Sequence, residues 1–288
     1  MQIGVVYPQT EFGHDPAAVR DFAQTAEGLG FSHIVAYDHV LGANPQRLGG
    51  WTGIYTHEHE FLEPFVLFTY MAAFTQRISF LPGILILPQR QTALVAKQAA
   101  TLDVLSRGRL RMGIGLGWNE VEFQALGEDF HTRGRRMSEQ VEVLRQLWSQ
   151  PLVAFSGRWH TIPDAGLNPL PVQRPIPLWF GGTAAPALRR AARLGDGWLN
   201  SSRSQADAET LVGTVREFVA AAGRDPQSYG IEVRIRCGDG NPDDWLSQLA
   251  RWKTFGVSHV AFNTLGSGFD APPAHLQALT RFAQAAGL

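Results

Sequence analysis

Short apolar runs alternate with longer segments of helical periodicity along nearly the whole chain. Most of the runs lack a strict apolar–polar alternation, which is typical of parallel strands that are buried on both faces. They predict eight strands, at residues 3–7, 33–37, 78–87, 110–116, 178–180, 197–200, 232–236 and 259–264.

Helical patterns fall between these strands, with apolar residues three and four positions apart. The first pattern has clear ends, because Asp15 is a good N-cap, Pro16 suits the first turn and Gly30 stops the pattern. Further helices are predicted at residues 94–105, 137–148, 185–194, 212–219, 245–255 and 276–286.

Strands that alternate with helices indicate a parallel sheet, and eight such units in 288 residues favour a closed (β/α)8 TIM barrel. A doubly wound sheet is the alternative, but no GxGxxG turn opens the first helix. We therefore expect a single α/β domain over residues 1–288. Two connections are longer than a simple barrel needs, at about 41–64 and 151–177, and the second is expected to hold a small hairpin.

The charge balance and the cysteine content narrow the class of protein. With 25 basic and 26 acidic residues and no block of like charge, neither a nucleic acid nor a membrane is an expected partner. The single cysteine, Cys237, fits a reducing compartment, and no signal-peptide pattern or bilayer-length apolar run occurs. These features predict a soluble cytoplasmic protein that acts on a small molecule.

The fourth predicted strand has glycine at every second position, at Gly113, Gly115 and Gly117. Side chains alternate between the two faces of a strand, so one face of this strand is bare. A bulge, or the close approach of another backbone or of a ligand, is the usual reason. If the bare face lies inside a barrel, a flat ligand is expected over the end of the strand.

Candidate chemistry gathers where the predicted strands end, which is the catalytic end of a barrel. Asp38 and His39 close the second strand, and His39 is suited to proton transfer or to a hydrogen bond with a cofactor ring. A polar pair that the backbone satisfies is the alternative interpretation.

Glycines after the fifth strand offer a second candidate site. Gly181, Gly182 and Thr183 lead into a helix, an arrangement that either binds an anion through backbone amides or makes a tight turn. Trp198, on the next strand, either walls a planar ligand or fills the core. Gly83, inside the third strand, indicates a bulge before Ile84.

The run HEHE at residues 57–60 offers ligands of the kind that zinc and iron prefer. It lies in the long connection after the second strand and not at a strand end. We interpret it as solvated polar surface and expect no metal. A metal-dependent barrel hydrolase is the corresponding alternative.

Taken together, the motifs resemble those of the luciferase-like monooxygenase superfamily over nearly the whole chain. The similarity rests on YDHV at the second strand, GILILPQRQ at the third, LDVLSRGRLRMGIGLGW into the fourth and PLWFGGTAAPALRRAARLGDGWL at the fifth and sixth. The GIGLGW and GDGW forms are similar to the branch of deazaflavin-dependent oxidoreductases, which use coenzyme F-420.

This resemblance implies a barrel that binds a flavin or deazaflavin at the C-terminal ends of its strands. His39 matches the family's histidine near the reactive edge of the ring, and Asp38 matches its acidic neighbour. Gly83–Ile84 matches a non-prolyl cis peptide under the ring, and the turn that begins at Gly181 matches the phosphate site. The expected cofactor-binding set is Asp38, His39, Gly83, Ile84, Gly115, Leu116, Gly181, Gly182, Thr183 and Trp198.

Two positions depart from better-understood members of the family. Leu116 stands where bacterial luciferases carry an arginine that contacts the FMN phosphate, although another arginine could substitute. Trp118 stands where a deazaflavin-dependent sugar-phosphate dehydrogenase has a glutamate acid, so that activity is not expected. The resemblance leaves the cofactor open between coenzyme F-420, which we favour, and FMN.

We expect an oxidoreductase that transfers a hydride between the cofactor ring and a small organic substrate. His39 is the expected catalytic acid/base, and Trp51, Tyr55 and Trp118 are the expected substrate wall. The alternatives are an FMN-dependent monooxygenase that uses reduced flavin and oxygen, and a non-catalytic flavin-binding protein. A homodimer is expected by analogy with relatives of this fold.

Overall fold

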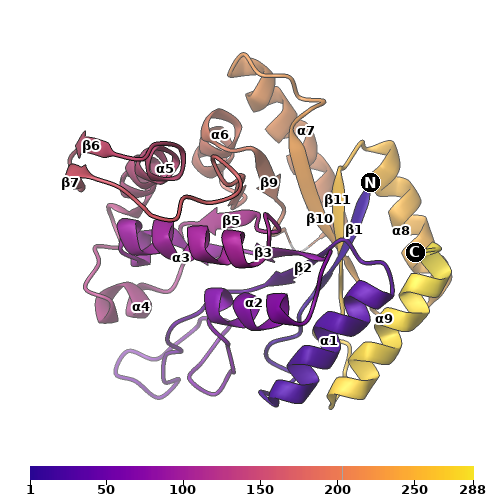
Figure 1. Ribbon diagram of the computed structural model, residues 1–288. Coiled ribbons are helices and arrows are strands. Elements are labelled where there is room, and N and C mark those ends of the chain that lie inside the picture. The colour runs from indigo at the N-terminus through magenta and orange to yellow at the C-terminus, as the bar shows by residue number, and fades with distance from the viewer. Residues whose placement is uncertain (203) are drawn as a thin grey trace.

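The computed structural model describes residues 1–202 and 204–288. In this part of the chain, a sheet of nine parallel strands curls into a barrel and helices cover its outside (Figure 1). The strands lie in the order β3-β2-β1-β11-β10-β9-β8-β5-β4. Their bounds are β1 Gln2–Val6, β2 His33–Ala36, β3 Ser79–Pro82, β4 Leu85–Ile86, β5 Met112–Gly115, β8 Leu178–Gly181, β9 Gly197–Leu199, β10 Gly230–Arg236 and β11 His259–Asn263.

One short contact closes the ring between β3 and β5. Phe80 of β3 forms an isolated bridge with Leu110, which precedes β5. The Phe80 amide donates to the Arg109 carbonyl oxygen at 2.8 Å, and the Arg111 amide donates to the Phe80 carbonyl oxygen at 3.0 Å. The predicted TIM barrel is confirmed, with a nearly closed ring.

The third barrel strand is broken in two, whereas the apolar run at residues 78–87 predicted a continuous strand. β3 ends at Pro82 and β4 begins at Leu85, and the peptide bond between Gly83 and Ile84 is cis. β3 pairs with β2, while β4 pairs with β5. The two pieces therefore share the place of one barrel strand.

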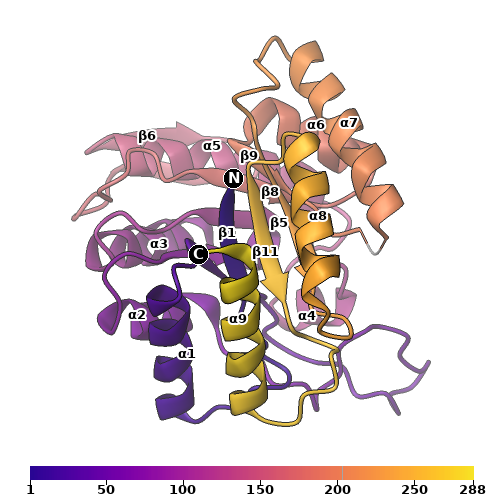
Figure 2. The ribbon, with the colours of Figure 1, turned by 90° about the vertical axis from the view of Figure 1, so that its right-hand side faces the viewer.

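The helices follow the strands around the outside of the barrel. Figure 2 shows α1, α9 and α8 side by side over β1 and β11. The bounds are α1 Pro16–Gly28, α2 Pro64–Ala73, α3 Thr92–Leu105, α4 Glu120–Ala125, α5 Arg133–Ser149, α6 Ala185–Leu194, α7 Gln205–Ala221, α8 Pro242–Thr254 and α9 Pro272–Ala286, with a short 3-10 turn at Leu87–Gln89. No helix in the described part of the chain is long and apolar enough to cross a membrane.

One of these helices, α2, was not predicted, whereas the acidic and aromatic residues after Trp118 indicated the start of α4 without its length. α2 is apolar on nearly all sides, so it shows no stripe of helical period, although Glu63 caps it by accepting from the Val66 amide at 2.9 Å. α4 has six residues and is capped by Asn119, which accepts from the Val121 amide at 3.1 Å. Their caps were visible in the sequence, but their periodicity was not.

The second long connection contains the expected hairpin. Its antiparallel strands are β6 Val153–Ser156 and β7 Thr161–Ala165. The first long connection is irregular and carries one parallel bridge, between Ala43 and Thr56, before α2 begins. This loop therefore reaches the open end of the barrel without adding a strand to it.

The glycines of β5 and its end make room for the broken strand beside them. A Cβ on Gly113 would overlap the carbonyl oxygen of Pro82, and a Cβ on Gly115 would lie 2.5 Å from Cδ1 of Ile84. The close approach that the bare face predicted is therefore made first by β3 and β4. A ligand can meet this face only beyond them, where Gly115 reaches a cavity.

The barrel interior is apolar in its middle and charged at its N-terminal end. The apolar cluster consists of Val6, Val35, Leu81, Trp179, Leu199 and Ala261. Below it, Nε2 of His33 lies 3.3 Å from Oε1 of Glu232, and Nη2 of Arg111 lies 2.6 Å from Oε2 of the same carboxylate. The His259 ring packs 5.7 Å from that of His33. We call His33, Arg111, Glu232 and His259 the charged layer, and it fills this end of the barrel.

Candidate active site

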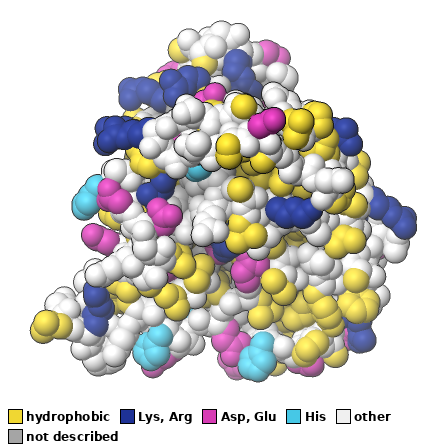
Figure 3. Space-filling view, turned by 60° about the vertical axis from the view of Figure 1, so that its left-hand side comes forward, with side chains coloured by type: hydrophobic (Ala, Val, Ile, Leu, Met, Phe, Trp, Pro, Cys, Tyr) yellow, Lys and Arg dark blue, Asp and Glu magenta, His cyan; other side chains and the backbone are white. Residues whose placement is uncertain are grey.

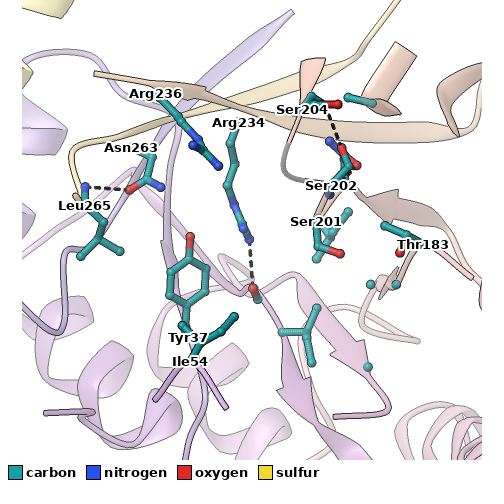
Figure 4. Close-up of a pocket in the computed structure, with 18 of the residues that line it drawn as sticks. Tyr37, Ile54, Thr183, Ser201, Ser202, Ser204, Arg234, Arg236, Asn263 and Leu265 are labelled. Atoms are coloured by element: carbon teal, nitrogen blue, oxygen red, sulfur yellow. Dashed lines mark hydrogen bonds between the residues drawn. The ribbon is translucent and has the colours of Figure 1, made fainter. Parts of the chain in front are cut away.

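A cavity of about 1130 Å³ opens at the C-terminal ends of the barrel strands, and Figure 4 shows part of its lining. The first long connection supplies one wall through Ile54 and Tyr55. Most of the predicted site residues line it, namely Asp38, His39, Tyr55, Gly83, Ile84, Gly115, Leu116, Trp118, Gly181, Gly182 and Thr183. Residues that are far apart in sequence therefore meet in one space.

His39 lies just beyond β2 and is held by a buried glutamate. Its Nδ1 lies 3.3 Å from both carboxylate oxygens of Glu122, which is fully buried at the start of α4. Glu122 also accepts from the Val40 and Leu41 amides, at 2.8 and 3.1 Å. Because Nδ1 is taken, Nε2 is the ring nitrogen left for a ligand.

The same contacts keep Glu122 ionised. Burial raises the pKa of Glu122, but the hydrogen bond and charge of His39 and the amides of Leu41 and Val40 outweigh burial, so its pKa is lowered. A carboxylate on Nδ1 fixes the orientation of the imidazole and decides which ring nitrogen faces the cavity. The arrangement suits a histidine that exchanges a proton with a ligand.

Aromatic side chains surround His39 on the cavity side. The rings of Tyr55 and Phe61 each lie 4.9 Å from it, edge to face, and the Trp118 ring lies 5.6 Å away. Trp118 is 42% exposed, so a flat apolar surface faces the cavity beside the histidine. Such a surface suits an apolar or aromatic ligand.

Asp38 lines the cavity, but its carboxylate is already bound. It accepts from the Ile86 amide at 2.9 Å and from Nη2 of Arg90 at 2.7 Å. The second arm of Arg90 binds Glu63 at 3.0 Å. Asp38 therefore ties the end of β2 to β4, directly after the cis peptide, and does so as a positioning group.

The turn after β8 presents backbone amides to the cavity. Gly182 has φ of +117°, which favours glycine, and no side chain caps α6, whose N-cap is Ala184. In the first turn of α6, Pro186 has no N–H and the Ala187 amide donates to the Ala184 carbonyl oxygen at 2.8 Å, so the turn offers the Ala185 amide and the positive end of the helix dipole. Thr183 adds a hydroxyl at the same place. The turn is suited to an anionic group.

Arg133, at the start of α5, lines the same cavity and was not predicted. Its guanidinium lies 3.6 Å from the centre of the Phe130 ring, and its Nη1 donates to the Phe130 carbonyl oxygen at 2.7 Å. Its Nε is buried and has no partner in the described part of the chain. This donor is available to an anion bound in the cavity.

Two predicted contacts lie outside the cavity lining. Trp198 is fully buried, and its indole N–H donates to the Gly182 carbonyl oxygen at 2.8 Å, so it supports the turn from behind. Trp51 packs 5.8 Å from Trp118 and donates to the Tyr55 carbonyl oxygen at 3.0 Å. Both therefore contact residues that line the cavity and do not line it themselves.

Sequence reasoning missed Glu122, Tyr37 and Arg234. Tyr37 and Arg234 line the cavity, and Figure 4 shows Arg234 reaching from β10 toward the space beside Tyr37. The alternation of charges at residues 232, 234 and 236 was the available signal, since these positions share one face of β10. The position of Glu122 depends on how α4 folds back to β2.

The histidine-rich loop shows no metal arrangement. In residues 1–202 and 204–288, no three His, Cys, Asp or Glu side chains are grouped so that they could hold a metal ion. His59 accepts from the Thr56 amide at 3.1 Å, and Glu60 pairs with His14 at 3.1 Å on the surface. These contacts agree with solvated polar surface.

Comparison with known proteins gives both a family and relatives of named activity. The family model described as luciferase-like monooxygenase matches residues 1–256. An uncharacterised protein of Mycobacterium tuberculosis is 36% identical over 233 residues, which is 79% of this chain and 79% of that protein. An F-420-dependent glucose-6-phosphate dehydrogenase of Kineococcus radiotolerans is 29% identical over 243 residues, 82% of this chain and 68% of that protein.

A third relative is named for a different cofactor. The FMNH2-dependent dimethylsulfone monooxygenase of Pseudomonas fluorescens is 32% identical over 206 residues, which is 70% of this chain and 52% of that protein. The chain therefore spans about half the length of this relative. The three matches include one protein named for F-420 and one named for FMNH2.

Solved structures share the fold at low sequence identity. The monooxygenase RslO1 of Streptomyces bottropensis has a TM-score of 0.81 at 19% identity and is similar over 99% of this chain and 98% of that chain. An F-420-dependent secondary alcohol dehydrogenase, bound to an F-420–acetone adduct, has a TM-score of 0.80 at 18% identity over 99% and 97% of the two chains. These likenesses support the barrel fold.

Proposed function

Because this chain belongs to the luciferase-like monooxygenase family, we propose that it transfers a hydride between a deazaflavin, coenzyme F-420, and a small organic substrate. The family comprises oxidoreductases and monooxygenases, and both kinds of activity are named among the relatives. The observation that carries the proposal is His39, fixed through Nδ1 by Glu122 at the edge of a large cavity.

The cavity residues fit such a cofactor. The uncapped turn at Gly182 and Thr183 would hold the phosphate, and Arg133, with its unpartnered buried Nε, would add a charge that Leu116 does not supply. Gly83, Ile84 and Gly115 would support the ring. When bound, the cofactor supplies the hydride chemistry, and the protein supplies binding, orientation and proton transfer.

The protein's own chemical step is a proton transfer at Nε2 of His39. Glu122 holds Nδ1, which keeps Nε2 directed at the ligand. Tyr55, Phe61 and Trp118 surround the ring and exclude water from it. His39 can therefore donate a proton to, or accept one from, a substrate oxygen beside the cofactor.

The size of the cavity favours an enzyme over a binding protein. Sites for one drug-sized ligand occupy about 300–1,000 Å³, whereas this cavity measures about 1130 Å³. A second ligand therefore has room beside the first. A non-catalytic flavin carrier needs no such room and no histidine aimed at it.

An FMN-dependent monooxygenase is the second candidate. The FMNH2-dependent relative favours it, and Arg133 could replace the arginine that Leu116 lacks. In this case the substrate would be an organic molecule that receives one oxygen atom. The same cavity residues would bind the cofactor, so the two candidates differ in cofactor affinity and not in architecture.

Separate titrations with coenzyme F-420 and with FMN test the proposal. Trp118 lines the cavity, so binding is expected to quench the intrinsic tryptophan fluorescence. The proposal expects tight binding of F-420 and weak binding of FMN. Tight binding of FMN alone would move the assignment to the monooxygenase, and binding of neither would overturn both.

We also propose that the protein works as a homodimer in a reducing compartment. Figure 3 shows hydrophobic side chains toward the lower right of one face of the molecule, and Val66, Leu94 and Leu105 are exposed on the neighbouring helices α2 and α3. Cys237 is buried and free. Light scattering should give twice the chain mass of 31.7 kDa, and a single-chain mass would contradict the dimer.

A further inference from the structure

Arg234 places a positive charge in the cavity without a protein carboxylate to balance it. It projects from β10, and its Nη2 donates to the Gly83 carbonyl oxygen at 3.1 Å. Its guanidinium also lies 4.7 Å from the centre of the Tyr37 ring. In the described part of the chain, no carboxylate oxygen lies within 4.0 Å of it. A partly buried cation without a counterion favours the binding of an anion.

Asp38, which lines the same cavity, does not neutralise this charge. Asp38 is buried, and Arg90 holds its carboxylate at 2.7 Å. Arg90 in turn is shared with Glu63. These three groups form a set of charges that pair with one another. The charge of Arg234 therefore remains directed at the cavity.

Two phenol groups, those of Tyr37 and Tyr55, line the cavity together with Arg234. Burial raises the pKa of Tyr55, the neighbouring Tyr37 raises it further, and Arg234 acts in the opposite direction. Neither phenol oxygen has a hydrogen-bond partner in the described residues. All three side chains line the same cavity and can donate hydrogen bonds into it.

We infer that Arg234, Tyr37 and Tyr55 bind the carboxylate of the substrate, so that the substrate class is a small organic acid with an apolar or aromatic body. The inference rests on the proposed function and adds to it the chemistry of the substrate. Tyr55 connects the two sites, because its ring lies 4.9 Å from that of His39. The carboxylate is thus placed near, but apart from, the atom that exchanges a proton with His39.

A carboxylate suits this set of donors better than a phosphate. The planar guanidinium has one arm on Gly83 and no other hydrogen bond to the described residues, and a planar carboxylate accepts from such a fork. The two phenols can satisfy its remaining lone pairs. The surrounding surface is apolar, with Ile54, Leu116 and the exposed face of Trp118. A substrate with one carboxylate on an apolar body therefore matches both the donor set and the apolar surface.

Benzoate and its neutral isostere benzamide are suitable probes for this site. With F-420 or FMN bound, calorimetric titration of the wild-type protein should show benzoate binding at least about tenfold more tightly than benzamide, or about 1.4 kcal/mol. Arg234→Gln should abolish this preference, and Tyr55→Phe should reduce it, while benzamide affinity stays the same. Tyr55→Phe leaves the Gly83 contact intact, so it tests the site even if Arg234→Gln does not fold.

Arg77→Gln is a matched control, because Arg77 is exposed and precedes β3 at the opposite end of the barrel. It should leave both probes unchanged. Equal binding of benzoate and benzamide to the wild type, or tighter binding of phenyl phosphate than of benzoate, would overturn the inference. A weaker cofactor affinity in Arg234→Gln with an unchanged benzoate preference would also overturn it, since Arg234 would then serve the cofactor.

The titrations separate this inference from the function on which it rests. If neither cofactor binds the wild-type protein, the proposed function fails. If a cofactor binds but the two probes bind equally, only the carboxylate site fails. Binding of a cofactor together with a benzoate preference that depends on Arg234 supports both.

Discussion

The two ends of β2 carry the same pair of groups in opposite surroundings. At its start, Nε2 of His33 lies 3.3 Å from the Glu232 carboxylate, and beyond its end, Nδ1 of His39 lies 3.3 Å from the Glu122 carboxylate. His33 and Glu232 are 2% and 4% exposed inside the barrel, whereas His39 faces the cavity. The distance within the pair therefore does not separate a structural histidine from a functional one.

The two ends differ in the group that balances the glutamate charge. Burial raises the pKa of Glu232, but the adjacent His33 and Arg111 outweigh it and hold that pKa at about 2. Burial lowers the pKa of His33, so the lasting ion pair is that of Arg111 and Glu232. At the open end, His39 is the only ionisable partner of Glu122 in the described residues. A permanent cation makes the first pair structural, and its absence leaves the second free to exchange a proton.

The largest expected effect is the loss of the histidine at the open end. His39→Ala removes the proton-transfer group, so turnover should fall about 10²–10⁴-fold, while the cofactor dissociation constant stays near the wild-type value. Steady-state kinetics and fluorescence titration measure the two quantities. His33→Asn, at the closed end, should leave turnover per folded molecule unchanged. Full turnover in the His39 variant would remove this residue from the mechanism.

The same substitution at the two glutamates should separate stability from activity. Glu232→Gln leaves Arg111 buried without a counterion, and the free energy of unfolding should fall by about 3–5 kcal/mol. Glu122→Gln leaves no permanent cation behind, so the free energy of unfolding should fall by only about 1–3 kcal/mol. Turnover, however, should fall. Urea unfolding and kinetics of both variants give the comparison. Equal losses of stability at the two ends would contradict it.

Acid should destabilise the folded protein mainly through the charged layer at the N-terminal end of the barrel. Burial, with smaller contributions from Arg111 and His33, lowers the pKa of His259 from 6.5 to about 3, and the pKa of His33 is lowered as well. Below pH 6.5 these histidines bind protons in the unfolded chain but stay neutral in the folded protein. The free energy of unfolding therefore falls as the pH drops toward 3. Glu232, whose pKa is about 2, adds a loss in the same direction below its usual value of 4.5.

Unfolding free energies measured from pH 7 to pH 4 check this dependence. Each such histidine contributes a slope of up to about 1.4 kcal/mol per pH unit. His259→Asn should reduce the slope of the wild-type protein by about that amount. A slope that this variant leaves unchanged would show that the charged layer does not control acid stability.

The smallest expected effect concerns the hydrogen bond that supports the turn at Gly182 and Thr183, at the C-terminal end of the barrel. Trp198→Phe removes the hydrogen bond to the Gly182 carbonyl oxygen, so cofactor affinity should fall by about 2–10-fold. Trp148→Phe is the matched control, because its indole donates to the Ala96 carbonyl oxygen at 3.0 Å away from the cavity. It should cost stability alone. Equal cofactor affinity in the two variants would exclude a role of Trp198 in holding the turn.

Local sequence patterns predict most of the barrel, because its strands and most helices are set by short-range signals. The apolar runs locate the strands, and Asp15 with Pro16 locates the start of α1. α2 escaped because a helix that is apolar all round has no period to detect. The apolar run at residues 78–87 did not show that the strand is interrupted between Pro82 and Leu85, but Gly83 indicated a bulge there and the family resemblance indicated the cis peptide that the structure has.

The site is less predictable, because its contacts join distant parts of the chain. His39 and the turn at Gly182 stand at strand ends and were found there. Glu122 reaches His39 only through the fold of α4, 83 residues further along the chain. Arg234 lies on the same face of β10 as the buried Glu232, so the sequence alone does not say which end of the barrel each charge serves.

The charged layer also affects the order in which ligands can bind at the C-terminal end of the barrel. With His33, Arg111, Glu232 and His259 packed across one end of the barrel, the cavity has its mouth at the opposite end. Two ligands that share one cavity entrance must bind in order, so the ligand that lies deeper binds first and dissociates last. An ordered kinetic mechanism would then follow from the shape of the barrel, without a conformational change and without a difference in affinity between the two ligands.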